Sequence, residues 1–203
     1  MKKICLILLL TIPVCLSAQQ GSWQNHRGDA RLSGVSYSKL PEEPGLLWSF
    51  NAGSGIKAAP VASGGIIVVG STEGALLGIN DDGSLRWKIM TENAFEAPAL
   101  IVGSTVYAGD LDGKLLAVDL ESGSLLWSYS TEGQIMGSPA YYSSGGKSAL
   151  LVGSYDFFLH AVDPANGEIL WRFDIVTGYS GERNSRNQTN TPLYHDGKLF
   201  STC

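Results

Sequence analysis

The chain has 203 residues, a formal net charge of −5 and 25 glycines. An acidic surface without a basic stripe repels phosphate backbones, which argues against a nucleic-acid-binding protein. After residue 20 no window keeps the i, i+3, i+4, i+7 apolar spacing of an amphipathic helix, and this excludes a mainly helical fold.

The first 18 residues have the layout of a cleaved secretory signal. Lys2 and Lys3 precede an apolar run, and Leu16-Ser17-Ala18 ends the segment. The apolar stretch from Ile4 to Leu16 is too short to span a bilayer. We therefore expect an exported protein, in the periplasm or outside the cell, with a signal peptide over residues 1–18 and no transmembrane segment after cleavage.

A polar lead-in over residues 19–44 is followed by a short apolar stretch. The sequence LLWSF at 46–50 matches LLWSY at 125–129 and ILWRF at 169–173, each of which ends a longer repeated unit. Residues 46–50 therefore predict an outermost strand without three earlier strands of its own. In a closed ring of blades such a strand is usually the clasp that completes the last blade.

Tryptophans at regular intervals mark an internal repeat. Trp48, Trp87, Trp127 and Trp171 are separated by 39, 40 and 44 residues. Before each of the last three, an apolar segment, a Gly-containing turn and a short apolar lead recur, and a Pro opens each unit. Each unit thus predicts four short antiparallel strands in about 40 residues, which is the length of one β-propeller blade.

Three complete units cover about 58–90, 97–130 and 137–175, and GKLFSTC at 197–203 matches the second strand of a fourth. The predicted fold is therefore all-β: a partial β-propeller of four-stranded antiparallel blades over residues 45–203, made of the clasp strand, three blades and the start of a fourth. A chain that stops inside a hairpin exposes an edge that proteins normally cover. We therefore expect the N-terminal part of a longer protein, shaped as an open arc.

The motif A-x-D-x-x-x-G-x-x-x-W occurs at Ala117–Trp127 and Ala161–Trp171, with a looser copy at Gly78–Trp87. It closely resembles the tryptophan-docking repeat of the pyrroloquinoline-quinone (PQQ) type β-propellers. In that family the Trp of each motif packs against the Ala and Gly of a neighbouring motif. The resemblance therefore implies that the tryptophans dock on surfaces formed by Ala117, Gly123, Ala161 and Gly167. It also implies that Trp48 docks, with its Ala and Gly partners expected beyond Cys203.

The PQQ-like family contains two functional kinds, and the fold does not decide between them. One kind comprises non-catalytic propellers, notably BamB-type proteins that assist outer-membrane protein assembly. The other comprises quinoprotein dehydrogenases, which hold PQQ and Ca²⁺ over the propeller axis and oxidise alcohols or sugars. The resemblance implies one of these two kinds, and individual residues have to favour one over the other.

Residues that would mark a quinone site are missing from this stretch. The adjacent Cys-Cys pair of many alcohol dehydrogenases has no counterpart, because Cys203 is the sole cysteine after the expected signal. Asp110 and Asp112 form a D-x-D-G fragment without the further oxygen ligands that calcium needs, so an acidic hairpin turn explains them. The three histidines fall in different units without metal-binding spacing. We predict no catalytic, cofactor-binding or metal-binding residues here; the alternative is a PQQ- and calcium-dependent dehydrogenase whose site is completed beyond Cys203.

One connection departs from the repeat. From Trp to the next Pro the chain takes 12, 11 and 12 residues in the first three cases, but 21 from Trp171 to Pro192. The extra residues fall in a polar loop at 178–191, where elongation leaves the sheets intact. We hypothesise a partner-binding loop, and a solvated connection is the alternative. The candidate binding residues are Arg183, Asn184, Arg186 and Asn187.

Two arginines on an otherwise acidic chain are suited to hold a carboxylate, a phosphate group or an acidic patch of a partner. The sequence as a whole therefore predicts an exported, non-catalytic β-propeller that binds a protein partner in the cell envelope, in outer-membrane protein assembly. The quinoprotein dehydrogenase stays open as the alternative.

Overall fold

The computed structural model describes residues 22–29, 31–36, 38–39 and 41–175, together with the backbone of 193–195 and 198–200. The expected signal peptide and the candidate binding loop lie outside these residues. All secondary-structure elements in the described part of the chain are β-strands. No helix in that part is long and apolar enough to cross a membrane.

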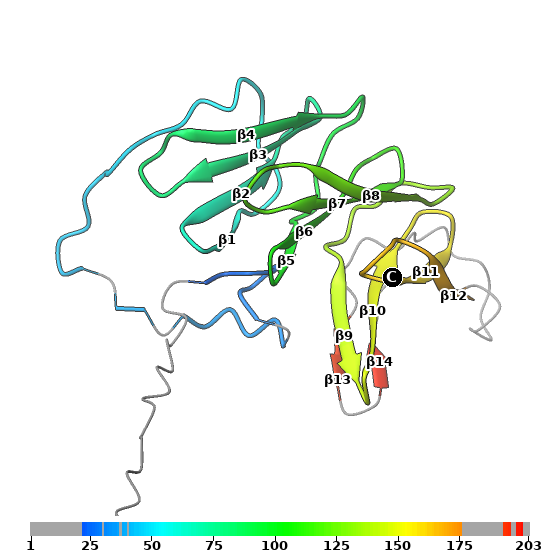
Figure 1. Cartoon of the computed structure of the whole chain (residues 1–203). Coiled ribbons are helices and arrows are strands. Elements are labelled where there is room, and N and C mark those ends of the chain that lie inside the picture. The colour runs from blue at the N-terminus through cyan, green and yellow to red at the C-terminus, as the bar shows by residue number, and fades with distance from the viewer. Residues whose placement is uncertain are drawn as a thin grey trace, which may run out of the picture.

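The described strands form three four-stranded antiparallel sheets, which we call blades 1, 2 and 3, and one two-stranded hairpin (Figure 1). Blade 1 consists of β1 (Val61–Ser63), β2 (Ile66–Gly70), β3 (Ala75–Asn80) and β4 (Leu85–Met90). Blade 2 consists of β5 (Leu100–Val102), β6 (Thr105–Gly109), β7 (Lys114–Asp119) and β8 (Leu125–Ser130). Blade 3 consists of β9 (Ala140–Ser144), β10 (Lys147–Gly153), β11 (Phe158–Val162) and β12 (Ile169–Asp174). The hairpin pairs β13 (Leu193–His195) with β14 (Lys198–Phe200). The predicted all-β fold of four-stranded antiparallel blades in an open arc is confirmed.

In each blade the strands are hydrogen-bonded in chain order, so the first strand lies at one edge and the fourth at the other. The central strands are almost wholly buried, whereas β4, β8 and β12 are largely exposed. The sequence reflects this burial, since β2 reads IIVVG and β7 reads KLLAVD. Short apolar runs of this kind are typical of strands that are covered on both faces.

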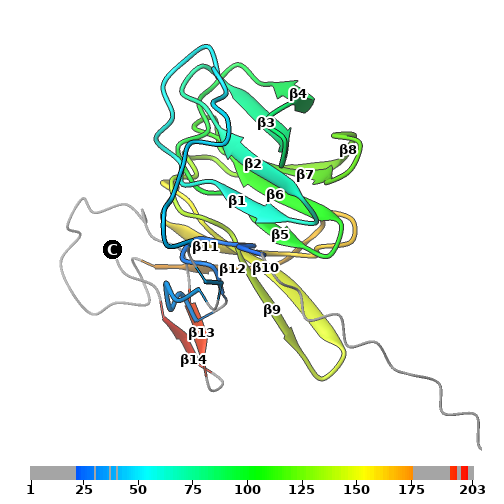
Figure 2. The ribbon, with the colours of Figure 1, turned by 90° about the vertical axis from the view of Figure 1, so that its left-hand side faces the viewer.

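Apolar clusters fill the two interfaces between successive blades, which follow one another as separate layers in Figure 2. Val68 and Leu76 of blade 1 pack with Val106 and Leu116 of blade 2. The second interface is built in the same way by Leu115, Ile135, Leu150 and Val162. Because each sheet is too thin to bury its own faces, each blade depends on its neighbours for an enclosed core.

Residues 46–50 are the segment predicted as the clasp strand, which stays a prediction because the blade that it would complete lies outside the described residues. They lie outside every named strand, and the side chains of Leu46 and Leu47 are 86% and 91% exposed. An outermost strand gains its ladder hydrogen bonds from the third strand of its own blade, and the described residues supply no such neighbour here. Trp48 and Phe50 nevertheless pack against buried side chains of blade 1.

The lead-in segment is paired with the first strands of two blades. Trp23 exchanges two main-chain hydrogen bonds of 2.8 Å with Ala62 in β1, and the carbonyl oxygen of Gln24 accepts the N–H of Ile101 in β5 at 2.7 Å. Residues 22–24 therefore cover part of the open edges of both strands, which would otherwise invite pairing with another chain. In Figure 1 this segment is the blue trace beside β5.

Candidate functional site

The side chain of Trp87 in β4 closes the junction between blades 1 and 2. It is 7% exposed, and its indole Nε1 donates to the carbonyl oxygen of Leu120 at 2.8 Å. The ring lies on the backbone of Gly123, where φ is 72° and a Cβ would stand 2.6 Å from Cγ of Trp87. Glycine suits this turn because it tolerates the positive φ and lets the indole approach the backbone.

Trp127 in β8 makes the same contact at the junction between blades 2 and 3. Its Nε1 donates to the carbonyl oxygen of Pro164 at 3.1 Å, and a Cβ at Gly167 would stand 2.6 Å from Cε3 of the ring. The hydroxyl of Tyr107 donates to the same carbonyl oxygen at 3.1 Å, and the two rings lie 5.7 Å apart. One carbonyl of blade 3 thus accepts two hydrogen bonds from blade 2.

Trp48 also docks, although its position differs from the prediction. Its Nε1 donates to the carbonyl oxygen of Asp81 at 2.8 Å, and its ring covers Gly83. The expectation that its glycine partner lies beyond Cys203 is therefore wrong, whereas an alanine partner beyond Cys203 stays a prediction. Trp48, Trp87 and Trp127 each dock onto the turn of the blade that follows them in the chain, so the first of them finds its glycine partner in blade 1.

The two alanines of the motif lie beside the Trp of their own blade rather than of a neighbouring blade. Ala117 is the cross-strand partner of Trp127, and Ala161 is the cross-strand partner of Trp171. Both alanines are fully buried. The motif therefore brings together a small residue of the Trp's own sheet and a glycine of the next one. Trp171 itself is 46% exposed, and no described residue stands to it as Gly123 stands to Trp87.

A chain of three polar side chains links blades 2 and 3 next to the docked Trp127. His160 in β11 is 3% exposed; its Nε2 lies 2.9 Å from Oδ2 of Asp156, and its Nδ1 lies 2.9 Å from the hydroxyl of Tyr129 in β8. The N–H groups of Glu132 and Phe158 also donate to the Asp156 carboxylate. In the neutral ring Nε2–H donates to Asp156, because a carboxylate only accepts, and Nδ1 then accepts from Tyr129.

Burial and hydrogen bonding shift the pKa values of two members of this chain. Burial raises the pKa of Asp156, but the hydrogen bonds from Phe158 and His160 outweigh burial and leave its pKa below the usual value. Burial raises the pKa of Tyr129, so its hydroxyl is protonated at neutral pH.

Asp110 is the buried carboxylate at the turn between β6 and β7. Its side chain is 1% exposed, and Oδ1 accepts the N–H groups of Asp112 and Lys114, both at 2.9 Å. Its Oδ2 has no hydrogen-bond partner among the described residues, and burial raises the pKa of the carboxyl. The corresponding turns of blades 1 and 3 carry the buried Ser71 and Ser154. Among the described residues no three His, Cys, Asp or Glu side chains gather as a metal site would require.

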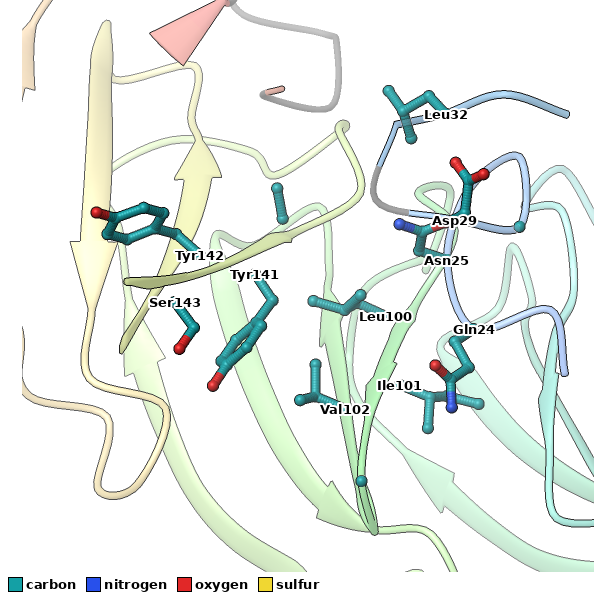
Figure 3. Close-up of a pocket in the computed structure, with 13 residues that line it drawn as sticks. Gln24, Asn25, Asp29, Leu32, Leu100, Ile101, Val102, Tyr141, Tyr142 and Ser143 are labelled. Carbon is teal, nitrogen blue, oxygen red and sulfur yellow. The ribbon is translucent and has the colours of Figure 1, made fainter. Parts of the chain in front are cut away.

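A cavity of about 330 Å³ lies between the lead-in and the first strands of blades 2 and 3 (Figure 3). Leu100, Val102 and Tyr141 face one another on the blade side, while Asn25 and Asp29 come from the lead-in. The Oδ1 atom of Asn25 is buried without a hydrogen-bond partner in the part of the chain that the structure describes. Sequence reasoning missed this cavity because its polar wall lies outside the repeat.

The sequence of this chain matches a known protein family. The sequence model of the family described as outer membrane protein assembly factor BamB matches residues 39–202. The chain belongs to this BamB family. Its PQQ-like repeats, predicted from the Trp motif, agree with that membership.

Relatives of both functional kinds are similar to this member of the BamB family. The outer membrane protein assembly factor BamB of Burkholderia pseudomallei is 24% identical over 143 residues, which are 69% of this chain and 38% of the relative. The quinohemoprotein alcohol dehydrogenase of Comamonas testosteroni is 29% identical over 175 residues, which cover 73% of this chain and 24% of the relative. The crystal structure of BamB from Moraxella catarrhalis has a TM-score of 0.63 at 27% identity, over 76% of this chain and 49% of that one.

The chain spans less than half of the length of each of these relatives. The four candidate binding residues of the BamB-family chain, Arg183, Asn184, Arg186 and Asn187, lie outside the described residues. The docking residues make structural contacts between blades. The sequence analysis did not predict the polar chain of Tyr129, His160 and Asp156.

Proposed function

We propose that this chain belongs to an exported, non-catalytic β-propeller that acts as a rigid protein-binding scaffold in outer-membrane protein assembly. The match of the BamB family over residues 39–202 is the observation that carries the proposal. The construction of the blades supports it. Three tryptophans lock successive units to the next through a hydrogen bond and a close ring contact, which gives a stiff frame for exposed turns.

The second candidate is a quinoprotein dehydrogenase, and the similarity to the Comamonas testosteroni enzyme favours it. The described residues do not fit a calcium-quinone site. Calcium takes six to eight oxygen ligands, whereas Asp110 offers one free carboxylate oxygen inside the turn and has no neighbouring set of ligands. We therefore derive no catalytic step through a quinone from these residues.

An experiment with two readouts separates the candidates. The complete protein is produced with and without PQQ and calcium, and dye-linked oxidation of alcohols and sugars is measured. In parallel, the same gene is introduced into a bacterial strain that lacks its own BamB, and folded outer-membrane protein is quantified. The scaffold proposal expects restored assembly and no dye reduction; oxidation with one equivalent of bound quinone would overturn it.

The elongated loop is tested in the same rescue assay. Replacing Arg183 and Arg186 by Ala should reduce the rescue without lowering the melting temperature, because the loop sits outside the repeat. Lys147→Ala, at an exposed position of β10, is a control for the loss of a positive charge elsewhere on the surface and should leave rescue unchanged. Full rescue by the double variant would remove the loop from the proposed binding surface.

A further inference from the structure

The outer edge of blade 2 is an open strand edge. β8 is the fourth strand of this blade, and among the described residues no strand is paired on its far side. Blades 1 and 3 pack against the two faces of blade 2; both are described, and neither covers this edge. In Figure 2, β8 lies on the side of the molecule away from the lead-in. The edge therefore belongs to a part of the arc whose neighbours on both sides are known.

The main-chain groups of Ser128 and Ser130 point away from the sheet. The N–H of Thr131 donates to the carbonyl oxygen of Gly113, and Leu116 is the cross-strand partner of Ser128. Hydrogen-bonded and non-hydrogen-bonded pairs alternate along an antiparallel ladder, so Ser128 and Ser130 belong to non-hydrogen-bonded pairs. The N–H and carbonyl groups of both serines are thus directed outward, at the spacing that a further strand requires.

The outer strands of the neighbouring blades carry a charge at the position of Ser128. Lys88 of β4 and Arg172 of β12 directly follow the Trp of their strands, as Ser128 does in β8. Charged side chains on an edge strand, Lys above all, discourage pairing with a further strand. β8 reads LLWSYS and has no charged residue. The register shift before the Trp occurs in all three blades and does not distinguish β8. Blade 2 is therefore the described blade whose outer edge lacks this protection.

The two faces of β8 differ in chemistry beside this edge. Trp127 and Tyr129 are half-buried and bond to blade 3, whereas Ser128 and Ser130 are exposed on the other face. Residues directly opposite each other on paired strands share a face and contact each other. An added strand would therefore meet aromatic rings on one face and small hydroxyl side chains on the other. The segment that fits is extended, with apolar residues alternating with Ser or Thr.

We propose that β8 is a docking edge, at which an extended segment of a protein partner with alternating apolar and Ser or Thr residues adds an antiparallel fifth strand to blade 2. The proposal rests on the proposed scaffold function and specifies the partner's chemistry. In this mode of binding the main-chain hydrogen bonds give affinity and the alternate side chains give specificity. Strands of outer-membrane β-barrels also alternate apolar and polar residues, which agrees with a role in their assembly.

The first test uses the full chain and a fluorescein-labelled octapeptide of alternating Thr and Val, with a short polyethylene glycol tail for solubility. Residues opposite Ser128 and Ser130 exchange hydrogen bonds with them, so the N–H groups of the peptide's Thr residues face β8. N-methylation of two Thr residues should raise the Kd, measured by fluorescence anisotropy, by about tenfold or more, as the loss of two hydrogen bonds implies. N-methylation of two Val residues, whose N–H groups face solvent, is the control and should leave the Kd unchanged.

Variants of β8 test the same edge from the side of the protein. Ser128→Pro removes an outward N–H and blocks a further strand, while the bonds between β8 and β7 stay intact; it should abolish measurable binding. Lys88→Pro makes the same change at the same position of β4 and should leave the Kd unchanged. Ser128→Lys copies the residue of blade 1 and should raise the Kd without lowering the melting temperature, because the position is exposed.

Equal affinity of the wild-type chain and both Ser128 variants would overturn the docking edge, as would equal binding of the parent and Thr-methylated peptides or no binding by the wild-type chain. A dimer of the wild-type chain that Ser128→Pro dissociates, seen by light scattering, would assign the edge to a second copy and overturn the proposed partner. None of these results affects the rescue assay. Rescue of assembly together with any of them refutes this inference alone, whereas oxidation with bound quinone refutes the scaffold function itself.

Discussion

The two junctions between blades solve the same packing problem with different chemistry. Between blades 1 and 2, Ile89 of β4 packs against an apolar cluster that contains Leu116 of β7. Between blades 2 and 3, the corresponding positions hold Tyr129 and His160, which are joined by a hydrogen bond and continue to Asp156. The backbone pairing is the same in both cases, since Leu116 and His160 each stand one position before the motif alanine.

This difference shows which contacts the propeller repeat requires and which it leaves free. Both junctions keep a Trp on a glycine turn, so that contact defines the spacing of the blades. The side chains two residues after the Trp vary between apolar and polar. A buried polar chain is tolerated only if each member is hydrogen-bonded, because an unpaired buried polar group is costly. The second junction is therefore more sensitive to single substitutions than the first.

The largest expected effect comes from removing the shared contact. Trp87→Ala should lower the free energy of unfolding by about 3–5 kcal/mol, since it empties an enclosed site and removes the bond to the Leu120 carbonyl. Trp171→Ala is the matched control and should cost markedly less, because that ring is 46% exposed. Urea unfolding followed by circular dichroism measures both. Equal losses in the two variants would contradict the docking interpretation.

The repeat could be recognised in the sequence because the units share one residue pattern. Three copies of one pattern in register predicted three four-stranded blades, and the apolar runs of the central strands predicted their burial. The direction of docking was not predictable in the same way. A regular spacing shows that Trp and Gly belong to adjacent units, but it does not say whether Trp48 leans toward the preceding or the following unit.

Features that depend on single departures from the repeat were harder to predict. The pairing of Trp23 with Ala62 uses main-chain atoms, which leave no residue signature. Tyr129 of the polar junction comes from a different blade than Asp156 and His160, so no local sequence motif predicts their hydrogen bonds. One signal was present, because His160 replaces a leucine of the other units while Tyr129 replaces an isoleucine. An alignment of the residues on both sides of each blade junction would have placed Tyr129 opposite His160.

The second prediction converts the polar junction step by step into the apolar one. His160→Leu should lower the free energy of unfolding by about 1–3 kcal/mol, because it leaves the half-buried Tyr129 hydroxyl and one face of Asp156 without a partner. The double variant Tyr129→Ile with His160→Leu should recover part of that loss, since it removes one orphaned group and copies the residues of the first junction.

A double-mutant cycle in urea measures the coupling between Tyr129 and His160. The cycle should give a favourable coupling energy, and Tyr129→Ile alone should be less harmful than His160→Leu alone, because His160 would keep its bond to Asp156. Additive losses in the cycle would show that the hydrogen bond between the rings contributes nothing, and the two junctions would then differ in composition without differing in sensitivity.

The smallest expected effect concerns the turn position at which Asp110 replaces the buried serines of blades 1 and 3. Burial raises the pKa of Asp110 above its unfolded value, so the folded chain favours the protonated carboxyl. The stability that this group contributes is fully present below the unfolded pKa and is lost as pH rises through the folded pKa.

Asp110→Ser removes this titration, while a serine hydroxyl here can still accept a turn N–H as Ser71 accepts that of Ala75 at 3.1 Å. The urea midpoint of the variant relative to wild type should therefore be higher at pH 7 than at pH 4. A relative midpoint for Asp110→Ser that falls between pH 4 and pH 7 would mean that the carboxylate is stabilised by its turn, and this blade would then be no more strained there than its neighbours.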